Sequence, residues 1–148
     1  MAESTGIPGV GTGERDPTTV VRSLMPFAGY LGITVVRYEA EEVRMSMAWA
    51  PQLCTAAGNL HGGALMALAD ASGAACALLN LPPEAPGTTT VESKTNFVRA
   101  VSGGEVATIS RPLHVGRTII LVETDLLDGG GRLAGRVTQS QLVLAARS

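Results

Sequence analysis

Residues 58–76 read GNLHGGALMALADASGAAC, and this stretch decides the fold. It is apolar almost all round, which predicts a helix over about 61–79 that is covered on most of its sides. Many of its residues are alanine, glycine or serine, so the surrounding backbone can approach closely. One long helix among antiparallel strands is typical of an α+β domain. We therefore predict one antiparallel sheet curled around this helix.

The segments on either side of the helix carry strand patterns, either rich in β-branched residues or alternating between apolar and polar positions. The predicted strands span residues 32–38, 43–49, 88–98, 105–115, 118–127 and 133–144. Asp16-Pro17 predicts the start of a short helix that runs to about Ala28, with an irregular last turn at Pro26. Residues 1–16 predict a disordered segment, which leaves 17–148 as a single domain.

Composition and charge exclude several function classes. The 148 residues carry a net charge of −2 with both signs scattered, which argues against a general nucleic-acid-binding face. Cys54 and Cys76 form no CxxC pair and no zinc-site spacing with the two histidines, and Cys76 is expected to be a small core residue. The apolar run over 64–81 is interrupted by Asp70, which makes a membrane span costly. No signal peptide is visible, so we expect a cytoplasmic protein with no bound metal and no nucleic-acid or membrane partner.

Asp70 is the most unusual residue of the predicted helix, because its neighbours Leu68, Ala69, Ala71 and Ala74 are all apolar. A buried carboxylate without a partner is costly, so it must be paired or change its protonation state. A mid-helix Asp is more often partly exposed or bonded to a neighbouring strand. The scarcity of other polar residues on this helix favours a functional role.

His61-Gly62-Gly63 opens the same helix. The first four N–H groups of a helix have no partner within it, and the helix dipole makes that end positive. Two glycines leave these N–H groups unshielded, which suits an oxyanion or the carbonyl oxygen of a thioester. The alternative is a helix start whose glycines serve only close packing, and the motif alone does not decide between the two.

The spacing of Gly62 and Asp70 adds a constraint. Eight residues along one helix correspond to about 12 Å, whereas two groups that act on one reacting centre must both lie about 3 Å from it. One helix therefore cannot supply both groups to one site. If both serve the same site, they come from different subunits, and a two-fold axis gives two identical sites per homodimer.

Four segments of the chain, over residues 61–70, 90–99, 114–117 and 128–138, resemble the hotdog-fold acyl-CoA thioesterases of the phenylacetyl-CoA and 4-hydroxybenzoyl-CoA thioesterase type. The resemblance covers about residues 24–145. It implies an antiparallel sheet wrapped around the central helix, assembly into dimers or dimer-of-dimers tetramers, and hydrolysis of an acyl-CoA to a free acid and CoA. It implies no cofactor apart from the CoA of the substrate.

The resemblance also implies roles for individual residues. Asp70 would act as general base on water or as nucleophile, and the Gly62 N–H would polarise the thioester carbonyl. His61 would orient the loop, and Thr90 would hold the attacking water, with Thr89 as the alternative if the alignment slips by one residue.

Substrate contacts are expected from Gly63, Thr55, Asn59 and Thr89 near the reacting centre. For the CoA phosphates the candidates are the basic side chains at strand ends, Arg99, His114 and Arg117. For any one of these three, a solvated charge at a strand edge is the commoner interpretation. The sequence departs from the family at Thr55, where related enzymes commonly carry Asn or Gln, and at Ala74, where some carry Thr.

Two other functions remain open. A hotdog module that binds acyl-CoA without hydrolysing it is compatible with Thr55, but binding alone does not need the acid at position 70. A dehydratase or hydratase pairs His and Asp as acid and base, and a His that precedes the glycines is a poor match. The acyl group, the choice between dimer and tetramer, and the pathway stay undetermined.

Overall fold

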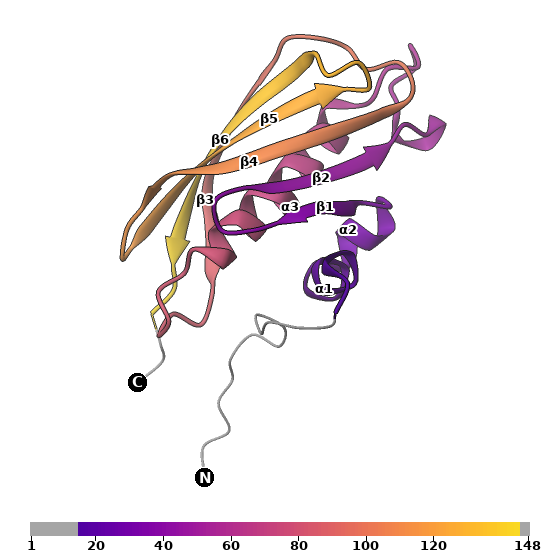
Figure 1. The fold of residues 1–148 in the computed structure, drawn as a ribbon. Helices are drawn as coiled ribbons and strands as arrows, with labels where there is room; N and C mark the ends of the chain where they lie inside the picture. Colours follow the sequence, from indigo (N-terminus) through magenta and orange to yellow (C-terminus); the bar gives the residue numbers. More distant parts are fainter. Residues whose placement is uncertain (1–14, 146–148) are drawn as a thin grey trace.

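The computed structural model describes residues 15–145, which form one antiparallel sheet with a long helix packed against it (Figure 1). The six strands lie in the order β1-β2-β4-β5-β6-β3. Their bounds are β1 Thr34–Tyr38, β2 Val43–Ala48, β3 Thr88–Phe97, β4 Glu105–Val115, β5 Ile119–Asp128 and β6 Leu133–Val143. This arrangement confirms the predicted α+β class. The expectation for residues 1–16 lies, except for residues 15 and 16, outside the described part of the chain.

The long helix α3 (Gly62–Leu79) packs against strands β2 to β6 and fills the core. Leu68, Ala69 and Cys76 are fully buried on it, which confirms Cys76 as a core residue. Asn80 ends the helix, and its side chain donates to the carbonyl oxygens of Cys76 and Ala40, at 2.8 and 2.7 Å. The helix is long and apolar enough to cross a membrane by composition, but half of it is buried within this domain.

The N-terminal helix differs from its prediction. The chain forms two helices, α1 (Pro17–Leu24) and α2 (Pro26–Tyr30), where one was predicted. Met25 leaves the helical conformation, with φ −129° and ψ 81°. The cause is Pro26, which has no N–H to continue the ladder and disfavours a helical residue before it.

One face of α3 also differs from the prediction that the helix is covered on most sides. The N-cap His61 is exposed in the single chain, as are Gly63, Met66 and Asp70, which follow one another at helical spacing. The neighbouring strand β3 lies at the edge of the sheet and exposes Val91 and Phe97, at 56% and 49%, along with other positions. The chain's own sheet therefore covers only one side of the helix.

Four hydroxyl side chains in the core are hydrogen-bonded to one another. The Ser72 hydroxyl of α3 bonds to that of Ser110 at 2.7 Å and accepts from that of Thr108 at 2.8 Å. Ser110 in turn bonds to the Thr124 hydroxyl at 2.7 Å. This chain of hydroxyls joins the helix to β4 and β5, and each of its members has a partner.

Glu42, in the turn between β1 and β2, is a buried carboxylate held by three arginines. Its side chain pairs with Arg44 at 2.6 Å and Arg37 at 3.2 Å, and also with Arg111. The hydrogen bond from Arg44 lowers the pKa of Glu42 below its ordinary value of 4.5, against the opposing effect of burial. Glu42 therefore stabilises the fold when it is ionised.

We expect this contribution to be fully present above about pH 4.5, where the carboxyl is ionised even in the unfolded chain. It declines as the pH falls toward the lower pKa of the folded state, because the unfolded chain then takes up the proton first. Glu42→Gln is expected to lower the melting temperature at neutral pH and to flatten its decline in acid. Thermal unfolding of both proteins from neutral to acidic pH measures this, and parallel curves would contradict it.

Candidate active site

The exposed face of α3 carries a hydrogen-bonded acid. Asp70 Oδ1 accepts from Gln139 Nε2 of β6 at 2.7 Å and from the Thr90 hydroxyl of β3 at 3.2 Å. Gln141 Nε2 donates to the Thr90 oxygen at 2.8 Å, so a second glutamine of β6 holds the threonine. Among residues 15–145, Asp70 Oδ2 has no hydrogen-bond partner. Oδ1 of Asp70 is therefore held by two hydrogen bonds, and Oδ2 is available to contact a ligand.

Strand pairing explains how these residues meet. Thr90 of β3 lies opposite Gln141 of β6 in the antiparallel register, and Gln139 is two residues away on the same face. Both glutamines are buried beneath α3. Thr89 points to the opposite face of β3 because side chains alternate along a strand. The structure therefore places Thr90 at the acid and leaves Thr89 away from it.

The start of α3 offers one free backbone donor. His61 caps the helix, and its Nδ1 accepts from the Gly63 N–H at 2.8 Å. The Gly62 N–H has no acceptor within the described chain. Because Nδ1 is an acceptor, the neutral His61 ring carries its proton on Nε2. Gly62 rather than Gly63 is therefore the position that can donate to a ligand.

Phe97, the last residue of β3, packs over this donor. A Cβ added at Gly62 would lie 3.1 Å from Phe97 Cζ, so the glycine lets the ring approach the helix start. Along β3, Phe97 lies beside Gly62 and Thr90 lies beside Asp70. The two halves of the predicted site, Gly62 and Asp70, therefore lie apart on one chain. This agrees with the distance of about 12 Å that eight residues span along a helix.

The loop before α3 holds two of the expected contact residues together. The Thr55 N–H donates to the Asn59 carbonyl at 2.8 Å, and the Thr55 hydroxyl lies 3.4 Å from the same oxygen. The His61 N–H donates to the Leu53 carbonyl at 2.8 Å, which ties this loop to the helix start. Thr55 and Asn59 are therefore near the Gly62 end of the site rather than the Asp70 end.

The three basic candidates for CoA phosphates are not brought together. Arg99 follows β3 and lies 4.0 Å from Asp128 at the end of β5. His114 and Arg117 lie at the opposite end of the sheet, around the turn between β4 and β5. An 11-residue strand such as β4 spans on the order of 30 Å. In one chain, the two groups cannot bind the same phosphate.

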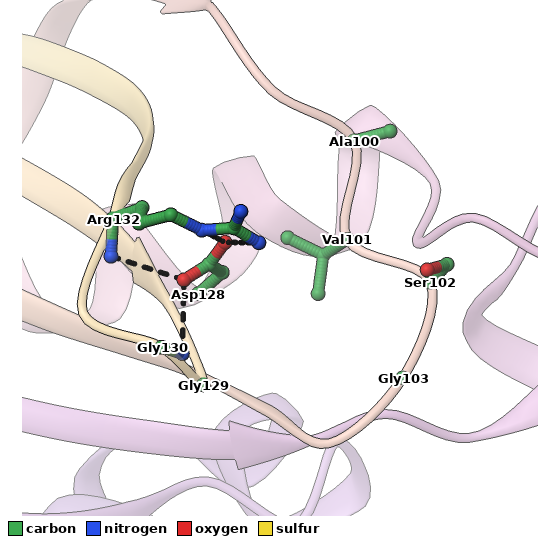
Figure 2. A pocket seen from close by; sticks show the side chains of 8 residues that line it. All are labelled: Ala100, Val101, Ser102, Gly103, Asp128, Gly129, Gly130 and Arg132. Carbon is green, nitrogen blue, oxygen red and sulfur yellow. Dashed lines mark hydrogen bonds and ion pairs between the residues drawn. The ribbon is translucent and has the colours of Figure 1, made fainter.

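A hollow of about 350 Å³ lies between the loop after β3 and the turn between β5 and β6. Figure 2 shows the side chains that line it. Asp128 accepts from the N–H groups of Gly130 and Arg132 and from Arg132 Nε, at 2.9 to 3.0 Å. These bonds hold the pKa of Asp128 below its ordinary value, and the bond from the Arg132 backbone N–H has the largest effect. The Asp128 carboxylate and the Arg132 guanidinium neutralise each other. The hollow is therefore lined by a hydrogen-bonded turn, and neither of these two charges is left unpaired to bind a ligand.

Gln139 and Gln141 are the site residues that sequence reasoning missed. In the sequence they stand in an alternating strand, VTQSQLV over residues 137–143, and resemble any other polar strand residues. The signal that could have identified them is which residues of this strand share one face of the sheet. Gln139 and Gln141 share the face of Val137, which is the face expected to be buried. Two glutamines on a buried face indicate a polar partner in the core.

The long helix inside a six-stranded antiparallel sheet is the hotdog arrangement that the resemblance implied. The thioesterase superfamily matches residues 57–134. A Mycobacterium tuberculosis protein named "Putative esterase Rv1847" is 32% identical over 114 residues, which cover 76% of this chain and 81% of the relative. The chain belongs to the thioesterase superfamily, and this membership supports thioester hydrolysis as its general activity.

Solved structures agree with this assignment of the fold. The structure of Rv1847 superposes with a TM-score of 0.80 at 28% identity, covering 84% of this chain and 100% of that one. Thioesterase HI1161 from Haemophilus influenzae gives 0.81 at 21% identity, covering 91% and 93%. A hypothetical thioesterase with coenzyme A from Streptococcus pneumoniae gives 0.69 at 22% identity, covering 78% and 88%.

Proposed function

We propose that this protein hydrolyses acyl-CoA thioesters to a free acid and CoA. The observation that carries the proposal is Asp70, a carboxylate on the exposed face of the core helix with one oxygen held by Thr90 and Gln139 and the other free. The S. pneumoniae thioesterase with coenzyme A, which shares the fold, supports CoA as the thiol. We expect the reaction to take place in the cytoplasm and to need no metal or further cofactor.

Asp70 has two possible roles in the same overall reaction. As general base, it takes a proton from water while the water oxygen attacks the thioester carbon. As nucleophile, it forms an anhydride with the acyl group, which water then cleaves. In both cases the C–S bond breaks, the CoA thiolate leaves and takes up a proton, and the acid is released. The Gly62 N–H stabilises the negative charge that develops on the carbonyl oxygen.

We propose that each site joins Asp70 of one subunit to the partner subunit's Gly62. Two β3 edges that pair antiparallel across a two-fold axis place the Thr90 end of one strand beside the Phe97 end of the other. Thr90 bonds to Asp70, and Phe97 packs on Gly62, so this pairing brings the acid and the donor together. Met66 of α3 and Val91 of β3 are exposed in the single chain, and we expect such a dimer to cover them.

The same arrangement bears on CoA binding. Since Arg99 lies at one end of the sheet and His114 with Arg117 at the other, each CoA phosphate would contact only one of these groups from a given subunit. A dimer offers both groups, from different subunits, around each site. A dimer of dimers would likewise offer both basic groups, from different subunits, around each site.

A thiol-release assay over short, medium, long and aryl acyl-CoAs tests the proposed function, with Asp70→Asn as the background control. Release above that control supports hydrolysis and gives the acyl preference. No release from any ester, together with a higher melting temperature in the presence of an acyl-CoA, would instead favour the non-catalytic binding module.

A further inference from the structure

Gln139 is buried more deeply than the acid that it contacts. Its side chain is 2% exposed, and its Nε2 donates to Asp70 Oδ1 at 2.7 Å. An amide N–H donates to a lone pair of its acceptor, so this bond occupies one acceptor position of Oδ1. Gln139 therefore fixes which oxygen of Asp70 is occupied and leaves Oδ2 as the oxygen without a partner in the described chain.

The other end of the same amide is unsatisfied. Gln139 Oε1 is buried and has no donor among the described residues. A buried carbonyl oxygen without a donor destabilises a folded protein, and each one in a native structure calls for an explanation. Methionine or leucine would fill the space without this cost, so the fold itself does not require glutamine at position 139.

Gly73, one turn beyond Asp70 on α3, makes room for this amide. A Cβ built at Gly73 would lie 1.8 Å from Gln139 Oε1 and 3.0 Å from its amide carbon. Even alanine at position 73 would push the amide away from its place. Glycine lowers helix stability in the middle of a helix, so α3 carries a second feature that serves the placement of Gln139 rather than the helix.

We propose that Gln139, seated against Gly73, is the positioning residue for Asp70. It holds Oδ1 so that Oδ2 is the oxygen that takes the proton from water or attacks the thioester. With Thr90 as its only donor, the carboxylate could rotate about the Cβ–Cγ bond of Asp70. One hydrogen bond sets the distance to one oxygen but does not set the plane of the carboxylate. The inference rests on the proposed function, since it assigns the geometry of the acid that the reaction uses.

Gln139→Met tests this with steady-state kinetics on an acyl-CoA that the wild-type protein hydrolyses. We expect kcat to fall about tenfold to a hundredfold, because misplacement of a reacting group by about 1 Å costs that much. We expect KM to change less than about twofold and the melting temperature to stay equal or rise, because the unsatisfied oxygen is gone. A residue that served only the fold would show the opposite, with a lower melting temperature.

Gly73→Ala provides an independent route to the same defect. The added methyl displaces the amide, so kcat should fall as in Gln139→Met, and the double variant should be no worse than Gln139→Met alone. Thr108→Val is the matched control, because it removes a buried hydrogen bond to Ser72 and lies on β4, a different strand from Gln139. It should lower the melting temperature and leave kcat unchanged.

The outcomes separate this inference from the proposed function. If Asp70→Asn is inactive but Gln139→Met keeps the wild-type kcat, the positioning role is wrong and the proposed function stands. It is also wrong if Gln139→Met loses kcat and melting temperature together while Gly73→Ala keeps full activity. If Asp70→Asn is itself fully active, the proposed function fails and the positioning role fails with it.

Discussion

Replacing Asp70 with asparagine is expected to lower kcat for acyl-CoA hydrolysis by about a thousandfold, within the range for loss of a general base. An amide can neither take a proton from water nor form an anhydride. The asparagine oxygen can still accept from Gln139 and Thr90, which now hold Oδ1 at 2.7 and 3.2 Å. The side chain is also exposed in the single chain, so the fold should be unchanged.

Thiol release and thermal unfolding of the variant measure the two parts of this expectation. Asp125→Asn is the matched control, because Asp125 is a carboxylate of β5 that pairs with Arg136 at 2.7 Å, on a different strand from Thr90 and Gln139. It should keep the wild-type kcat. An Asp70→Asn protein that retains more than about a tenth of the activity would rule out the acid as base or nucleophile.

Replacing Gly62 with proline is expected to lower kcat by about a hundredfold or more, as for loss of one oxyanion donor. Proline removes the N–H and adds a side-chain ring, and the first position of a helix tolerates it. The preceding His61 already has φ −64° and ψ 137°, the extended conformation that a residue before proline prefers. Gly62→Ala is the matched control, because it adds the same Cβ against the Phe97 ring but keeps the donor.

The two inactive variants together test whether the site spans two subunits. Heterodimers of Asp70→Asn and Gly62→Pro chains can be isolated by coexpression with two affinity tags. If the site joins Asp70 to the partner subunit's Gly62, one of the two sites in each heterodimer is intact, and about half of the wild-type activity returns. If both residues served one chain's own site, every site would carry a defect and activity would stay at background.

The sequence predicted the secondary structure well where the physical signal is local. The central helix begins one residue from its predicted start and ends where it was expected, because its length, its apolar composition and the His-Gly-Gly opening all agree. The strand at 105–115 matches fully, and its burial alternates from Glu105 to Ser110. The first helix was wrong at Pro26, where the missing N–H ended α1 instead of merely distorting its last turn.

The site was predictable only in part, because its parts meet through tertiary pairing. Asp70 and Gly62 stood out as residues that a helix does not need. Gln139 did not, because its role depends on the register between β3 and β6 and on the gap at Gly73, neither of which is local. The position of the basic residues also depends on tertiary pairing. Arg99 and Arg117 follow strands that end at opposite ends of the sheet, so they do not lie together.

The strand order has a consequence for how the chain matures during synthesis. Among the described strands, β3 pairs only with β6, which is synthesised after β4 and β5, so β3 emerges long before its partner exists. Such long-range pairing slows folding and leaves a strand edge open to aggregation meanwhile. Gln139 arrives on that same late strand. A nascent or truncated chain that lacks β6 therefore leaves β3 unpaired, and we expect it to be inactive because Gln139 is missing.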